Sequence, residues 1–466
     1  MFLGRLEELN YLDNYFKKAG SQMVVLYGRK HMGKTALIKK FVESKDYSYY
    51  LARTCSEKEQ QFEWTNELMD QGFELESDAD YSEILKLITG VESRKKIIVI
   101  DEFQNLVRTG ESFMNALINV LHEQWNSQPV MIILSSSSLG WVENSMVTKI
   151  GKAAYEISGF LKVKELSFSY MREYFPGFTR QQCIEAYAVL GGVPGLWKYF
   201  DDSLSIKENI IKNILSPEAY LYQEGGRQVS EELRETSVYH TILTTIAAGK
   251  YKLNDLYAHT GFSRAKISVY LKNLMELEII EKVNSFELEG KDNTQKGIYR
   301  ICNHYINFWF KFLYRNCSSL AMANSEDFFT EYIEPVFKRY VASYFNKVCI
   351  NYIQEQAKLM SEAAGNTLAQ SSKLPFIPKK YGEWIGKSGI IDIVAEDENN
   401  QILIGACNFE KPIMDYEDYE WLIFCAKQAK VEPASIYLFS EGRFDEKLYL
   451  ESKVKKSLHL VDFKEL

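Results

Sequence analysis

The sequence predicts an α/β multidomain protein built around a parallel sheet that helices cover on both faces. In the first third of the chain, short apolar runs alternate with amphipathic helical stretches, as in a parallel sheet packed between helices. Three of these runs contain no charged residue, namely Met23–Tyr27, Ile97–Ile100 and Val130–Leu134. Strands that are buried on both faces have this composition. We therefore expect these three runs to form the centre of the sheet.

The chain has 466 residues, which is more than one ordinary domain of about 100–200 residues contains. The patterns divide it into four expected domains. Residues 1–166 form the parallel-sheet core, and residues 167–228 form a small helical lid in which Gly191–Gly195 separates two helices. Residues 229–300 form a winged helix-turn-helix, and residues 301–466 form a final mixed α/β domain.

The third domain is predicted from three helical segments that are followed by a polar hairpin over Glu281–Arg300. The helical segments are Tyr239–Gly249, Leu253–Thr260 and Arg264–Leu277. Ser263 is a suitable N-cap for the last of them, which would be the recognition helix of the motif. In the final domain, three runs are predicted to be strands: Ile390–Ala395, Ile402–Cys407 and Ala434–Phe439.

Composition limits the classes of function. With 46% hydrophobic and 25% charged residues, the chain is expected to be globular. The net charge of -8 confines any contact with DNA to a local patch. The seven cysteines are scattered without a CxxC pair, which favours reduced thiols. Since no segment has the ~20 apolar residues that span a bilayer, we expect a soluble, cytoplasmic protein without a membrane partner.

The strongest motif is the segment that follows the first predicted strand. Residues 28–35 fit the pattern GxxxxGK[ST], which lies between a strand and a helix in phosphate-binding loops. Backbone N–H groups of such a loop face the phosphates, Lys34 would reach the β- and γ-phosphates, and the Thr35 hydroxyl would ligate Mg²⁺. The predicted cofactors are therefore ATP and Mg²⁺. The predicted nucleotide-binding residues are Gly28, Arg29, Lys30, His31, Met32, Gly33, Lys34, Thr35 and Ala36.

The second predicted strand ends in two adjacent carboxylates, Asp101 and Glu102. Placing acids at the end of a buried strand is costly unless they have a function. We expect Asp101 to hold Mg²⁺ through water and Glu102 to act as the general base that polarises the attacking water. The third strand continues into four serines, 135–138, of which Ser135 and Ser137 are candidate sensors of the γ-phosphate. Together these features predict an ATP hydrolase.

These motifs resemble the archaeal-type ATPases, which are relatives of the STAND and origin-initiator ATPases within the AAA+ class. The resemblance also rests on the opening segment Phe2–Leu9 and on the break Gly191–Pro194. It implies that Gly4 and Arg5 lie near the adenine and that Pro194, in the lid, closes over the nucleotide.

The resemblance further implies a restriction-endonuclease-like C-terminal domain. Asp392 is similar to the metal-binding Asp of that fold, but Ala406 stands where the family has Glu and Asn408 where it has Lys. Upstream, Asn346 replaces an expected Glu. Because nuclease chemistry needs several carboxylates and a cation, we expect a degenerate, non-cleaving domain.

Three functions remain open on the sequence alone. The leading one is an ATP-driven switch that repositions the winged helix and the C-terminal domain. The second is a DNA-binding regulator tuned by ATP, although residues 250–300 contain nine basic and seven acidic side chains. The third is a metal-dependent nuclease. A protein client, oligomerisation and the source of an arginine finger also remain open; the candidate residues for the finger are Arg53, Arg108, Arg227 and Lys152.

Overall fold

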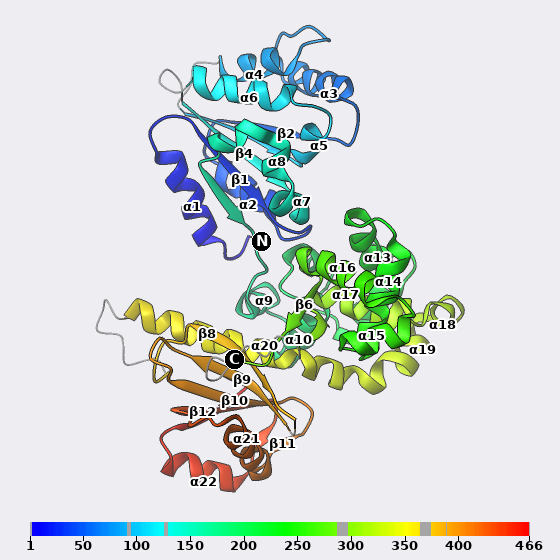
Figure 1. Ribbon diagram of the computed structural model, residues 1–466, viewed down its shortest axis with the longest axis vertical. Helices are drawn as coiled ribbons and strands as arrows, with labels where there is room; N and C mark the ends of the chain where they lie inside the picture. Colours follow the sequence, from blue (N-terminus) through cyan, green and yellow to red (C-terminus); the bar gives the residue numbers. More distant parts are fainter. Residues whose placement is uncertain are drawn as a thin grey trace. The chain divides into compact units, whose positions relative to one another are not determined.

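The computed structural model describes residues 2–90, 95–124, 129–286, 297–363, 374–387 and 389–465. The chain forms two compact units (Figure 1). The first unit contains residues 1–166 together with the short segment Val193–Trp197, and the second contains residues 167–192 and 198–466. The chain therefore enters the first unit a second time for only five residues.

A five-stranded sheet forms the centre of the first unit. The strands are β1 (Gln22–Tyr27), β2 (Tyr47–Leu51), β3 (Lys96–Asp101), β4 (Val130–Ser136) and β5 (Gly159–Lys162). They pair in the order β2-β3-β4-β1-β5, and each pairing is parallel. The three apolar runs of the sequence are β1, β3 and β4, so the prediction of a buried parallel sheet is confirmed.

Helices cover both faces of this sheet. The helices of the first unit are α1 (Leu6–Lys17), α2 (Lys34–Val42), α3 (Glu57–Asp70), α4 (Tyr81–Thr89), α5 (Gln104–Val107), α6 (Ser112–Glu123), α7 (Leu139–Asn144), α8 (Met146–Ile150), η1 (Gly151–Glu156) and α11 (Pro194–Trp197). Figure 1 shows α4 and α6 on one side of the sheet and α1 and α2 on the other. Residues 23–26 of β1 and 97–100 of β3 are fully buried. Because successive side chains point to opposite faces of the sheet, both faces are covered there, as in a parallel sheet packed between helices.

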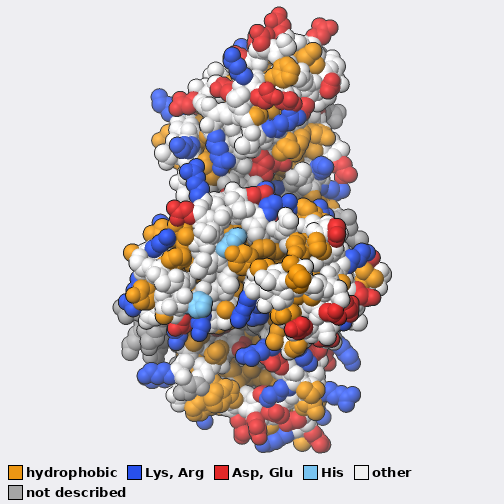
Figure 2. Space-filling model, turned by 90° about the vertical axis from the view of Figure 1, so that its right-hand side faces the viewer, with side chains coloured by type: hydrophobic (Ala, Val, Ile, Leu, Met, Phe, Trp, Pro, Cys, Tyr) orange, Lys and Arg blue, Asp and Glu red, His pale blue; other side chains and the backbone are white. Residues whose placement is uncertain are grey.

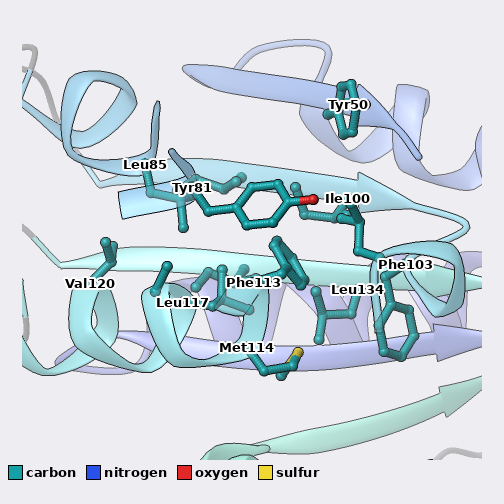
Figure 3. Close-up of a cluster of buried hydrophobic side chains, with 14 of the residues drawn as sticks. Tyr50, Tyr81, Leu85, Ile100, Phe103, Phe113, Met114, Leu117, Val120 and Leu134 are labelled. Atoms are coloured by element: carbon teal, nitrogen blue, oxygen red, sulfur yellow. The ribbon is translucent and has the colours of Figure 1, made fainter. Parts of the chain in front are cut away.

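An aromatic and aliphatic core fills the space between the sheet and α3, α4 and α6 (Figure 3). Trp64 of α3 stacks on Tyr50 of β2 with ring centroids 4.4 Å apart. Tyr81 meets Phe113 edge to face at 5.5 Å. Such ring pairs contribute about 0.5–1.5 kcal/mol each beyond their buried area. This core therefore fixes the strands whose carboxyl ends carry the candidate site.

The second unit begins with helices. They are α9 (Phe168–Tyr174), α10 (Arg180–Leu190), α12 (Ile206–Ile210), η2 (Ile211–Leu215), α13 (Tyr220–Glu232), α14 (Thr236–Ala247), α15 (Leu253–Thr260), α16 (Arg264–Glu276), α17 (His304–Phe308), η4 (Trp309–Tyr314), α18 (Cys317–Met322), α19 (Ser325–Phe328), η5 (Phe329–Ile333) and α20 (Glu334–Ala363). The aromatic stretch through α17 and η4 is largely buried, which is where a run of apolar side chains at helical spacing belongs.

Helices α14, α15 and α16 share one core with a small antiparallel sheet. Its strands are β6 (Ile280–Val283) and β7 (Ile298–Ile301). The Ser263 side chain accepts a hydrogen bond from the Lys266 amide and so caps α16 as expected. Ile267, Leu271 and Leu274 of α16 face the core. The tip of the predicted hairpin, residues 287–296, lies outside the described residues.

The chain ends in a second five-stranded sheet of order β14-β12-β10-β9-β8. Its strands are β8 (Lys380–Ile385), β9 (Ile390–Glu396), β10 (Ile402–Asn408), β12 (Ser435–Ser440) and β14 (Leu458–Asp462), and a separate two-stranded ladder joins β11 (Ile413–Met414) to β13 (Arg443–Phe444). α21 (Tyr416–Ala429) and α22 (Glu446–Val454) belong to the core of this sheet. Aromatic side chains of α20 also contact it, such as Tyr352 against Phe439 of β12.

Within the described part of the chain, no helix is both long and apolar enough to cross a bilayer.

Candidate active site

The GxxxxGK[ST] loop lies between β1 and α2, as the motif predicts. Its backbone enters the left-handed region at Gly28 (φ 155°), His31 (φ 65°) and Gly33 (φ 87°). A Cβ atom on Gly28 would lie 2.5 Å from the backbone oxygen of Val163. Only glycine therefore fits at position 28. These dihedral angles curl the loop, and successive amides in such a curl can converge on an anion.

Two side chains at the start of α2 lie at this loop. The Lys34 ammonium donates to the carbonyl oxygens of Gly28 at 2.8 Å and Arg29 at 3.1 Å, so its charge is held over the loop. The Thr35 hydroxyl donates to Asp101 Oδ2 at 3.2 Å. The loop and the acidic end of β3 are thus brought together across 66 residues of sequence.

The remaining predicted loop residues differ in exposure. Lys30 and Ala36 are exposed, whereas Met32 is buried. Arg29 forms an ion pair with Glu165, which lies three residues after the end of β5. Arg29 therefore ties the loop to the edge of the sheet.

Arg5 and Gly195 hold the loop from two sides. Arg5 is 7% exposed, and its guanidinium donates to the carbonyl oxygens of Met32 at 2.9 Å and Lys164 at 2.6 Å. The Gly195 amide donates to the carbonyl oxygen of His31 at 2.9 Å. Both residues therefore bind loop backbone, and each donates a hydrogen bond to a loop carbonyl.

Gly4 and Pro194 flank these two contacts. Gly4 has a φ of 62° and leads into Arg5 at the start of α1. A Cβ atom on Gly33 would lie 3.6 Å from Pro194 Cγ, which places the Pro194 ring beside the loop. The sequence drew attention to Pro194, but the residue that donates the hydrogen bond is its neighbour Gly195.

Asp101 is nearly fully buried, with 4% of its surface exposed, and receives three hydrogen bonds. Oδ2 accepts from Thr35 and from the Tyr49 hydroxyl at 2.9 Å, and Oδ1 accepts from the Glu102 amide at 3.1 Å. Burial, together with the Asp101 carboxylate, raises the pKa of the Tyr49 hydroxyl, which therefore stays protonated and can donate. Tyr49 was not among the sequence candidates, because nothing in its local pattern indicates a partner 52 residues away.

Glu102 occupies the left-handed region with a φ of 54°, which is uncommon for a non-glycine residue. Its Oε2 atom accepts from the Ser137 hydroxyl at 2.7 Å, from the Ser137 amide at 3.2 Å and from the Gln104 amide group at 2.5 Å. Backbone strain of this kind is found most often at functional sites.

The two serine candidates have different surroundings. Ser135 lies inside β4 and is fully buried, whereas Ser137 follows the strand and contacts Glu102. The sequence predicted a strand that ends at Leu134, but β4 continues through Ser136. The reason is pairing, because Ser135 and Ser136 oppose Leu26 and Tyr27 of β1.

The chemistry of the donor set fits a hydrated Mg²⁺ ion. A threonine hydroxyl and an aspartate carboxylate are hard oxygen ligands, and they lie 3.2 Å apart. Mg²⁺ usually retains several waters and takes one or two protein oxygens together with phosphate oxygens. Thr35 and Asp101 would hold it, and bound at this place it would neutralise charge on the phosphates.

Asp392, the candidate metal ligand of the C-terminal domain, lies on β9. Its Oδ2 accepts from the Cys407 amide at 2.8 Å. Burial raises the pKa of Asp392 to about 6, although this hydrogen bond lowers it. The Asn408 amide group donates to the Lys411 carbonyl at 3.0 Å, so this side chain orders the following loop. Among the described residues, no group of three or more His, Cys, Asp or Glu side chains is placed to hold a metal ion.

An ion pair near Asp392 was missed by the sequence reasoning. Glu383 of β8 accepts two hydrogen bonds from Arg300 of β7, at 2.6 and 2.8 Å. It also accepts one at 3.1 Å from Asn346, which stands where a family Glu was expected. Arg300 therefore neutralises this second carboxylate and joins the β6–β7 hairpin to the C-terminal sheet. No local pattern marks such a pair, since its members are 83 residues apart.

A parallel sheet, a strand–GxxxxGK[ST]–helix unit and an acidic end on a neighbouring strand define the first unit as a P-loop ATPase core. Residues 2–200 match the family described as an ATPase domain predominantly from Archaea. Residues 309–420 match a family described as archaeal and bacterial proteins of unknown function.

Relatives extend this match. An uncharacterized protein of Methanocaldococcus jannaschii is 26% identical over 419 residues, which cover 86% of this chain and 85% of the relative. An uncharacterized ATP-binding protein of the same organism is 47% identical over 45 residues, which cover 10% of this chain and 76% of the relative. The first unit therefore contains an ATPase domain of the kind found predominantly in Archaea.

Solved structures of low sequence identity are also similar. The Walker-type ATPase of Pyrococcus abyssi matches with a TM-score of 0.47 and 16% identity, over 66% of this chain and 96% of that one. The ORC2 protein of Aeropyrum pernix matches with a TM-score of 0.44 and 16% identity, over 69% and 95% respectively.

The Asp392→Asn variant tests the account of the buried carboxyl in the C-terminal sheet. The pKa of Asp392 is raised in the folded state from 3.8 to about 6, so the folded chain binds the proton more tightly than the unfolded chain does. The stability that the protonated carboxyl contributes is present below about pH 4 and is lost as pH rises through 6. The free energy of unfolding of Asp392→Asn, measured relative to that of the native chain, should therefore increase by up to about 3 kcal/mol between pH 4 and pH 7.

Denaturant unfolding of both proteins at the two pH values measures this gain. A difference between native chain and variant that is the same at pH 4 and pH 7 would contradict a raised pKa at this position.

Proposed function

We propose that this protein binds ATP with Mg²⁺ at residues 28–36, hydrolyses the ATP, and uses the cycle as a switch that acts through the segment Val193–Trp197. The observation that supports the switch is the hydrogen bond from Gly195 to the carbonyl oxygen of His31 at the tip of the loop. Residues on both sides of this segment belong to the second unit, while the segment itself belongs to the first. A change in the loop would therefore displace the segment Val193–Trp197, which is covalently joined to the second unit at both ends.

In the proposed reaction, each residue of the site has one role. Loop amides and the Lys34 ammonium bind the β- and γ-phosphates, because they place positive charge where the transferred phosphoryl group develops negative charge. Thr35 and Asp101 hold Mg²⁺. Glu102 orients and polarises the attacking water. Ser137 keeps the Glu102 carboxylate at the end of β4, while Ser135, which is buried, supports the strand.

The lid segment, Val193–Trp197, would respond to nucleotide because its Gly195 amide is hydrogen-bonded to the loop backbone. His31 is a non-glycine residue held at positive φ, and its carbonyl is fixed by Gly195. If binding of phosphates reorients the 28–33 amides, the His31 carbonyl moves with them. ATP then favours one position of residues 193–197 over another, and a ligand can shift such an equilibrium only through this kind of differential contact.

A second candidate function, DNA binding tuned by ATP, is favoured by the surface of α16. Arg264, Lys266 and Lys272 are exposed, while the opposite side of the helix packs into the core. Three helices followed by a hairpin are what a winged helix-turn-helix would need, which supports this candidate. Figure 2 nevertheless shows Lys and Arg side chains interspersed with Asp and Glu over the face in view. Binding would therefore be local and strongly salt-dependent.

We do not propose nuclease activity. Glu383, the second carboxylate in the neighbourhood of Asp392, is already neutralised by Arg300.

Two candidates for an arginine finger have intrachain partners: Arg53 pairs with Glu63 and Glu67, and Arg227 pairs with Glu224.

Hydrolysis and binding should separate in two variants. Lys34→Ala removes charge from the phosphates, so both ATP affinity and phosphate release should fall. Glu102→Gln keeps the shape of the site but cannot accept a proton, so it should bind ATP normally and release phosphate roughly 100-fold or more slowly. A phosphate-release assay and a titration with a fluorescent ATP analogue measure the two effects. Native phosphate release in both variants would refute the assignment.

Gly195→Ala should uncouple the lid segment from the loop. The new Cβ atom would lie 2.7 Å from the carbonyl oxygen of His31, so the two backbones must move apart. We expect ATP affinity to fall by roughly 5–150-fold, the range of ordinary coupling energies. Gly110→Ala is the matched control, because its Cβ atom would meet only the end of the Glu57 side chain at 3.2 Å. Equal ATP affinity in the native chain and Gly195→Ala would argue against the switch.

DNA binding is tested by removing two charges from α16. The double variant Arg264→Ala, Lys266→Ala should weaken binding of duplex DNA at low salt and reduce the slope of log K against log [salt] by about 2, since each phosphate contact contributes about 0.9. The control Lys453→Ala, Lys456→Ala removes two exposed charges elsewhere. If the two double variants bind DNA alike, α16 is not the contact surface.

A further inference from the structure

Tyr49 occupies an unusual place on β2. Its ring lies half-buried, and its hydroxyl donates to Asp101 Oδ2 at 2.9 Å. Thr35 donates to the same oxygen from the other partner element, α2, at 3.2 Å. One carboxylate oxygen of the candidate metal site is therefore positioned by two hydroxyls, one from the loop side and one from the neighbouring strand.

The adjacent tyrosine has a different role. Tyr50 points to the opposite face of β2, as side chains of successive strand residues do, and lies in the core between the sheet and α3 (Figure 3). Its hydroxyl donates to the backbone oxygen of Gln60 at 3.0 Å and to Oε1 of Gln60 at 2.8 Å. Both tyrosines have desolvated hydroxyls, but only that of Tyr49 contacts the candidate site.

Packing alone does not explain a hydroxyl at position 49. A phenylalanine ring would fill the same volume, and a hydroxyl that is removed from water costs free energy unless it finds a partner. The partner here is a carboxylate that would bind metal. A carboxylate side chain can rotate about its terminal bond, and only some orientations direct Oδ2 toward Thr35.

We propose that Tyr49 is a positioning residue for Mg²⁺: its hydroxyl holds the Asp101 carboxylate in the orientation in which Oδ2 and the Thr35 hydroxyl face the same hydrated ion. Tyr49 touches neither nucleotide nor metal in this proposal and acts through Asp101. The inference rests on the proposed function, since it assumes that residues 28–36 bind ATP with Mg²⁺.

The consequence is a specific defect in Tyr49→Phe. Loss of an outer-shell partner of a metal ligand typically lowers metal affinity by 10–100-fold. The Mg²⁺ concentration that gives half-maximal enhancement of ATP binding should therefore rise by about 10–100-fold in this variant. ATP affinity in the presence of EDTA should remain native, because the loop amides and Lys34 are untouched. Saturating Mg²⁺ should restore the native ATP affinity.

The experiment is a titration of the full chain with a fluorescent ATP analogue at a series of Mg²⁺ concentrations and in EDTA. Native chain, Tyr49→Phe and Tyr50→Phe are compared, and the thermal midpoint of each is recorded. Tyr50→Phe is the matched control because it removes the neighbouring buried hydroxyl on the other face of the strand. It should lower the thermal midpoint and leave the Mg²⁺ half-point native.

Two results would overturn the proposal. One is a native Mg²⁺ half-point in Tyr49→Phe, and the other is an equal loss of affinity in EDTA and in Mg²⁺, which would mean general damage to the site. Failure of the proposed function looks different, because the native chain itself would then bind no ATP analogue at any Mg²⁺ concentration.

Discussion

The candidate site depends on the parallel pairing of β1, β3 and β4. Because the strands run in the same direction, their carboxyl ends meet at one edge of the sheet, where the loop after β1, the acids at the end of β3 and the serines at the end of β4 lie together. The register matters here, because slipping a strand by one residue would turn each of its side chains to the opposite face. Thr35 and Asp101 contact each other as a result.

The phosphate loop is held by elements far from it in sequence. Arg5 binds the carbonyl of Met32 from the start of the chain, and Gly195 binds the carbonyl of His31 from a segment that the chain reaches only after leaving the first unit. A curled loop exposes carbonyls on its outer side, and both contacts satisfy them. In the proposed switch, the ligand and residues 193–197 would bias the same loop backbone through these contacts.

The second unit contains Asp392, the one residue that resembles the metal-binding Asp of the expected pattern, beside an ion pair. Asp392 has a raised pKa because it is desolvated, and Glu383 is paired with Arg300 from the β6–β7 hairpin. An arginine that bridges two structural parts fixes their geometry and also removes the negative charge that would attract a cation. The ion pair thereby joins the hairpin to the C-terminal sheet within this unit.

The sequence could predict the features that depend on local patterns. Three uncharged apolar runs identified β1, β3 and β4, and the glycine spacing identified the loop, because burial and positive φ restrict residue type strongly. Tyr49, Gly195 and Glu383 could not be predicted in the same way. Each acts through a partner that is 37–164 residues away in the sequence. A tyrosine on a strand or a glycine in a turn has the same local sequence pattern with or without such a partner.

The central claim is that the backbone amides after β1 bind the phosphates of ATP and that residues 193–197 respond. Hydrogen exchange of the full chain, with and without ATP and Mg²⁺, tests it most directly, because protection reports on individual backbone amides. We expect peptides that cover residues 28–36 to gain protection together with peptides that cover 193–197. Unchanged exchange at residues 28–36 under saturating ATP and Mg²⁺ would contradict the account.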